Sequence, residues 1–63
     1  MAYTLNDFRP ANRIEMHPAT DLWAMGARFG TVIRVGRQRL VVKLDKLNHT
    51  VRVSPENICN IVE

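Results

Sequence analysis

Hydrophobic and polar residues alternate along the middle of the chain, and this alternation predicts three consecutive β-strands. The runs span residues 31–35, 39–45 and 50–53 and are rich in β-branched residues. A period of two assigns the following side chains to the inward face: Thr31, Ile33 and Val35 in the first run, Leu40, Val42 and Leu44 in the second, Val51 and Val53 in the third. We therefore expect a three-stranded antiparallel meander.

Turn-forming residues separate the runs. Gly36 can adopt the positive φ of a tight connection, so residues 36–38 predict a hairpin turn. Asn48 tolerates the left-handed backbone region and predicts the second turn.

Two further strands are predicted on either side of the meander. Residues 13–17 alternate, with Ile14 and Met16 on one face, before Pro18 ends the run. After the meander, Ser54 is a helix-capping residue and Pro55 suits the first helical position, which predicts one helical turn before a last strand in residues 58–63.

Residues 18–30 and 1–12 lack a clear period. In the first segment Asp21 could cap a helix, but Gly26 and Gly30 follow too soon for more than one turn, so we expect a long loop. The second segment is assigned as an N-terminal arm, separate from a domain of residues 13–63. Because the arm holds no predicted strand, we expect it to be dispensable for folding, with its aromatic residues Tyr3 and Phe8 either packed on the domain or forming a subunit interface.

The order of these elements resembles the SH3-like barrels: an all-β fold of five short strands with a helical turn before the last one. The resemblance covers residues 13–63. Residues 26–35, which read GARFGTVIRV, are also similar to the glycine-then-hydrophobic start of KOW-type barrels in ribosomal and transcription proteins.

A second resemblance lies near the C-terminus. Residues 51–55, which read VRVSP, and the ENICNIVE that follows are similar to the end of the plasmid-encoded type II dihydrofolate reductases, which are SH3-like tetramers. In that family the segment reads Val-Gln-Ile-Tyr-Pro, and its glutamine and tyrosine line a shared pore for folate and the nicotinamide cofactor. Here those positions hold Arg52 and Ser54. The resemblance therefore implies the fold and an oligomer more than the reductase activity, and we expect no cofactor.

Length and composition are those of one small globular domain. The chain has 63 residues, 46% hydrophobic and 24% charged, with one cysteine, Cys59, which excludes an internal disulfide. No apolar run approaches the length of a membrane span and no signal-peptide pattern is present, so we expect a cytoplasmic protein.

Positive charge is concentrated in the meander. Residues 26–54 hold seven Lys and Arg residues against a single acidic one, Asp45, although the net charge of the whole chain is only +3. The basic residues of the strands fall on the outward parity, and one more lies in the hairpin turn: Arg34, Arg37, Arg39, Lys43 and Arg52. The pattern favours binding to the phosphate backbone of DNA or RNA. The alternative is a solvated strand face whose charges protect against aggregation.

Catalysis and metal binding are not predicted. Nucleophilic or acid–base chemistry needs several groups brought together, and the carboxylates Glu15 and Asp45 stand alone in the sequence. His17, His49 and Cys59 are the remaining metal-ligand types, and no two lie at metal-binding spacing. We therefore expect a binding module rather than an enzyme.

The alternative function is protein binding through the apolar loop formed by Leu22, Trp23 and Met25, since a tryptophan anchor is the usual centre of such an interface. An accessory factor encoded by a phage or mobile element, and a homo-oligomer, are compatible with the same residues.

Overall fold

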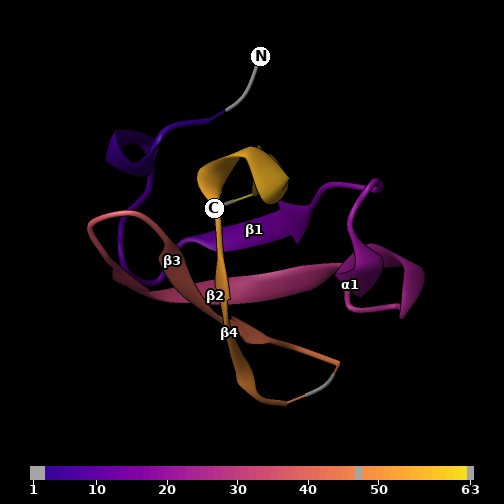
Figure 1. Cartoon of the computed structure of the whole chain (residues 1–63). Coiled ribbons are helices and arrows are strands. Elements are labelled where there is room, and N and C mark those ends of the chain that lie inside the picture. Colours follow the sequence, from indigo (N-terminus) through magenta and orange to yellow (C-terminus); the bar gives the residue numbers. More distant parts are fainter. Residues whose placement is uncertain (1–2, 47, 63) are drawn as a thin grey trace.

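Five antiparallel strands form one sheet, which confirms the predicted all-β fold (Figure 1). The computed structural model describes residues 3–46 and 48–62. The strands are β1 (Arg13–Met16), β2 (Phe29–Val35), β3 (Leu40–Leu44), β4 (Thr50–Val53) and β5 (Ile58–Ile61). Their order in the sheet is β4-β3-β2-β1-β5, so β1 to β4 are a meander and β5 returns to pair with β1.

The connections follow the predicted positions with two changes of detail. Gly36 donates its N–H to the carbonyl of Arg39 (2.9 Å) and closes the β2–β3 hairpin, but its φ is not positive; a Cβ there would lie 2.8 Å from that carbonyl oxygen. Asn48 does adopt the left-handed region, with φ 53°. The helical turn before β5 is a 3-10 helix, η2 (Pro55–Asn57), with Ser54 at its N-cap position, although the Ser54 side chain makes no capping hydrogen bond.

The long loop contains one helical turn, α1 (Asp21–Ala24). Its cap is Thr20 rather than Asp21, because the Thr20 hydroxyl accepts a hydrogen bond from the backbone N–H of Trp23 (3.2 Å). Gly26 follows with φ 88° and ends the turn in a conformation that favours glycine.

The core is built mainly from alternate strand residues, with Phe8 and Ala27 added from outside the strands. Its buried members are Phe8, Ile14, Met16, Ala27, Val32, Leu40, Val42, Leu44, Val53 and Ile58. The predicted inward faces of β1 and β3 are confirmed by this set. In β4, Val53 is buried and Val51 is half-buried against the core.

Strand β2 departs from the predicted alternation. Val32 pairs with Val42 and Arg34 pairs with Val41, so Ile33 is an extra residue in a β-bulge. Val32 is therefore buried while Ile33 is 48% exposed, and the prediction that Ile33 lies in the core is wrong. Thr31, which pairs with Lys43, is likewise on the outward face, whereas Val35 packs against the core as predicted.

The N-terminal arm contributes to the core. It forms a 3-10 helix, η1 (Leu5–Asp7), and then passes alongside β2, where the N–H of Ala11 donates to the carbonyl of Val32 (2.7 Å). Phe8 is 2% exposed, and the ring of Tyr3 packs edge-on against it with centroids 5.6 Å apart. Removing residues 1–12 would therefore uncover the core, contrary to the expectation that the arm is dispensable for folding.

Candidate nucleic-acid interface

Strands β2, β3 and β4 place a row of three residues across the outward face of the sheet. Arg34 lies opposite Val41, and Val41 lies opposite Arg52. Neighbouring strands are about 5 Å apart, so the Cα atoms of the two arginines are roughly 10 Å from each other. Both arginines are exposed and the valine between them is half-buried. An apolar residue of β3 thus separates two cations on the strands that flank it.

Two more cations lie along the direction of β3, one in the strand and one directly before it. Arg39 precedes Val41 by two residues and Lys43 follows it by two, and both side chains are exposed. A strand rises about 3.3 Å per residue, so the Cα atom of each of these cations lies roughly 7 Å from that of Val41. Four cations therefore surround Val41. Together with Arg37, which is exposed in the hairpin turn, they form what we call the basic face: Arg34, Arg37, Arg39, Lys43 and Arg52.

The basic face is hollowed at two adjoining places. One shallow hollow lies at the hairpin and is lined by Arg34, Gly36, Arg37, Gln38, Arg39, Val41 and Arg52. The other lies on the bulge side and is lined by Ile33, Arg34, Val41, Thr50, Val51 and Arg52. Arg34, Val41 and Arg52 line both, so the surface around Val41 can receive a ligand between the charged side chains.

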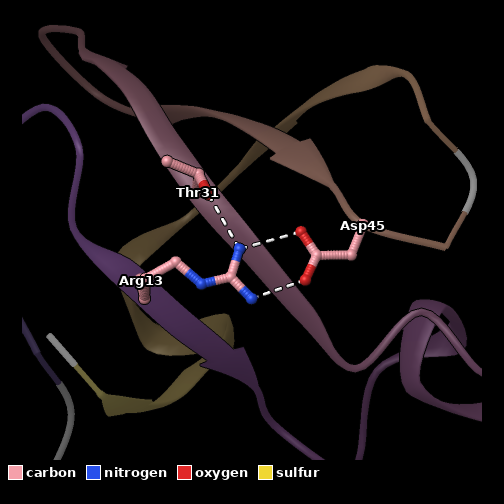
Figure 2. A network of polar contacts seen from close by, with 3 residues as sticks. All are labelled: Arg13, Thr31 and Asp45. Atoms are coloured by element: carbon pink, nitrogen blue, oxygen red, sulfur yellow. Dashed lines mark hydrogen bonds and ion pairs between the residues drawn. The ribbon is translucent and has the colours of Figure 1, made fainter.

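The cations of the basic face have no carboxylate partner within the described part of the chain, where the single ion pair joins Arg13 to Asp45. Figure 2 shows that Asp45, the single acidic residue of residues 26–54, is held by this pair: Arg13 Nη1 donates to Asp45 Oδ1 (2.8 Å) and Nη2 donates to Oδ2. Arg13 Nη1 also donates to the Thr31 hydroxyl (2.8 Å). The positive charge of the basic face is therefore left for solvent ions or a ligand.

Asp45 gives this ion pair a pH dependence. The hydrogen bonds from Arg13 lower the pKa of the Asp45 carboxyl below its ordinary value. A lowered folded-state pKa contributes stability at pH values above the unfolded value, about 3.9, and that contribution is lost as the pH falls through the folded value. Arg13 and Asp45 side chains are 36% and 49% exposed, so solvent screening keeps the contribution below about 1 kcal/mol.

We expect Asp45→Asn to lower the melting temperature by a few degrees at pH 7 and by less near pH 2, because the contribution of the carboxylate falls as the pH approaches the lowered pKa of Asp45. Thermal melts of both proteins, followed by circular dichroism across this pH range, test the expectation. A deficit of the variant that is as large at pH 2 as at pH 7 would mean that Asp45 stabilises the fold in another way.

Three residues near this site were not identified from the sequence. Arg13 begins the first predicted strand and was not assigned to the outward basic residues, yet it pairs with Thr31 across β1 and β2 and shares the outward face. Ile33 was assigned to the core. Val41 was assigned to the outward face, but only the pairing of both neighbouring strands shows that it lies at the centre of the cations.

The loop proposed as the alternative protein-binding surface packs in part against the protein's own core. Leu22 and Trp23 are half-buried and pack against the core, while Met25 is 59% exposed. The guanidinium carbon of Arg28 lies 4.7 Å from the centroid of the Trp23 ring, a cation–π contact that covers part of the ring. Trp23 is thus less available to a partner than its position in a loop suggests.

A third hollow joins the loop to the turn before β5. It is lined by His17, Ala19, Thr20, Asp21, Glu56 and Asn57, and His17 Nδ1 accepts a hydrogen bond from the N–H of Ala19 (3.0 Å).

Over residues 3–46 and 48–62, no three His, Cys, Asp or Glu side chains are gathered as a metal would require. His49 and Cys59 are exposed and lie elsewhere.

No helix in the described ranges is both long and apolar enough to cross a bilayer. Comparisons of the chain with protein-family models, with curated proteins and with solved structures returned no significant match.

Proposed function

We propose that this protein binds nucleic acid by its phosphate backbone, through the basic face. The observation that carries the proposal is the group of four cations around Val41, none of which has a carboxylate partner among the described residues. Two unit charges 10 Å apart repel by about 0.4 kcal/mol in water, so the arrangement costs the free protein stability. Phosphates placed among the cations remove this repulsion and release their own condensed counterions.

The contacts available on this face favour the backbone over the base edges. Arg34 and Arg52 extend from strands, Arg39 directly precedes β3, and all three line an open hollow. The described structure presents no helix on this face that could enter a major groove. Binding of this kind depends weakly on sequence. DNA and RNA offer the same phosphate chemistry, so both are candidate partners.

The proposal includes a non-enzymatic role and a cytoplasmic location. The order of elements, with a 3-10 turn before the last of five strands, supports the likeness to SH3-like and KOW-type barrels. A protein partner held by Leu22, Trp23 and Met25 remains the second candidate because Met25 is 59% exposed. A homo-oligomer and an accessory role in a phage or mobile element are extensions that the binding experiments below do not require.

Fluorescence-anisotropy titrations at two salt concentrations test the proposed function. About four phosphate contacts to a single strand predict a slope of log affinity against log salt near −3, so affinity should fall roughly 50-fold between 50 and 200 mM salt. We expect micromolar affinity at the lower concentration. Single- and double-stranded DNA and RNA are titrated in parallel, and a failure to bind any of them at low salt would leave the basic face as a solvated exterior.

A further inference from the structure

We propose that the basic face selects single-stranded over double-stranded nucleic acid, because a base can lie on the apolar surface formed by Ile33 and Val41. This inference rests on the proposed function and specifies its ligand. It adds a base contact to the phosphate contacts already described.

The first observation is the exposure of Ile33. The β-bulge leaves it without a partner in the β2–β3 register, and its side chain is 48% exposed beside Arg34. A large aliphatic side chain in water loses the free energy that burial in the core would have given it. A ligand with an apolar surface would recover part of that free energy.

The second observation is that Ile33 and Val41 line the same hollow, with Arg34 and Arg52 as its charged members. The apolar and cationic groups therefore share one depression rather than separate patches. A nucleotide of a single strand presents both matching parts, a flat base and a phosphate. The guanidinium planes of arginines also stack on bases, which allows the same side chains to contact base and backbone.

A duplex matches this surface poorly. Its base faces are stacked inside the helix, so only phosphates, sugars and groove edges reach a protein surface. With a duplex, the phosphates would contact the cations and the hollow between Ile33 and Val41 would stay empty. With a single strand, the phosphates would contact the cations and a base would also enter the hollow. Contacts to the face of a base tolerate any base.

The experiment compares three DNA probes of equal length, about 12 nucleotides: a single strand, a duplex, and a single strand whose central positions are abasic. The abasic probe keeps the phosphates and lacks the bases that would enter the hollow. We expect the intact single strand to bind about tenfold more tightly than either of the others.

Variants then locate the base contact. The double variant Ile33→Thr, Val41→Thr keeps β-branched residues in the strands and removes apolar surface, so it should bind the intact and abasic strands equally well. Val62→Thr is the matched control, because Val62 is 51% exposed and follows β5, two positions from β2 in the sheet order. It should behave like the wild type.

Two results would overturn the inference while leaving the proposed function intact: equal affinity of the wild type for all three probes, or an undiminished preference for the intact strand in a folded double variant. Absence of binding to every probe at low salt would instead remove the proposed function, and the inference with it.

Discussion

Replacing Val42 by aspartate should leave the chain unfolded at 25 °C. Val42 is fully buried at the centre of β3, between Val32 on β2 and Val51 on β4. A buried carboxylate without a partner costs several kcal/mol, to which the lost apolar contacts of the valine add. A domain of this length has a total stability of only about 3–9 kcal/mol. Far-ultraviolet circular dichroism and urea titration measure the loss.

Ile33→Asp is the control for this prediction. It makes the same kind of change in a β-branched residue of the neighbouring strand, but Ile33 is 48% exposed and stands beside Arg34. The new carboxylate would meet water and a cation, so the free energy of unfolding should change by less than about 1 kcal/mol. A folded Val42→Asp variant, or an unfolded Ile33→Asp variant, would show that the register of β2 and β3 is wrong.

These two residues mark the limit of what alternation predicts. In β3 the core residues Leu40, Val42 and Leu44 alternate with Val41 and Lys43, and only one face is continuously aliphatic and uncharged, so the inward face was predicted correctly. In β2, Val32 and Ile33 are adjacent β-branched residues, and a period of two accepts either as the inward one. The bulge that decides between them arises from pairing with β3, which the local sequence of β2 does not encode.

The arm shows a second limit. Phe8 and Tyr3 stand among polar and turn-forming residues with no period, so their side chains could be assigned neither to the core nor to the surface from the sequence. The structure uses Phe8 as a core side chain, held in place by a segment that is not itself a strand. Isolated aromatic residues in irregular segments pack according to the tertiary fold, and local patterns carry little information about them.

The basic face was largely predictable because it depends on parity within each strand. The bulge at Ile33 reverses the predicted inward and outward assignment of Thr31 and Val32, which precede it. Arg34 follows the bulge and faces outward with Val41, as predicted. The pairing of Arg13 with Asp45 was not predictable. The two residues are 32 positions apart, and they meet only because β1 and β3 both lie beside β2.

Reversing the charge of Arg34, Arg39 and Arg52 together should abolish nucleic-acid binding, with at least a 100-fold loss of affinity at low salt. All three line the hollow at the hairpin, and the change to glutamate replaces three phosphate contacts by three repulsions. The side chains are exposed, so the fold should persist, which circular dichroism verifies. Anisotropy titration of the wild type and the triple variant against one single-stranded probe gives the ratio of affinities.

A second triple variant, with Arg9, Arg28 and Lys46 changed to glutamate, is the control for the effect of net charge alone. These exposed cations lie outside the basic face, and both triple variants take the formal net charge from +3 to −3. At 0.1 M salt the screening length is about 10 Å, so charges away from the ligand act on it only weakly, and we expect the control to lose less than tenfold. Equal losses in the two variants would mean that the affinity for the single-stranded probe depends on the total charge of the protein. The cations around Val41 would then not form the binding site.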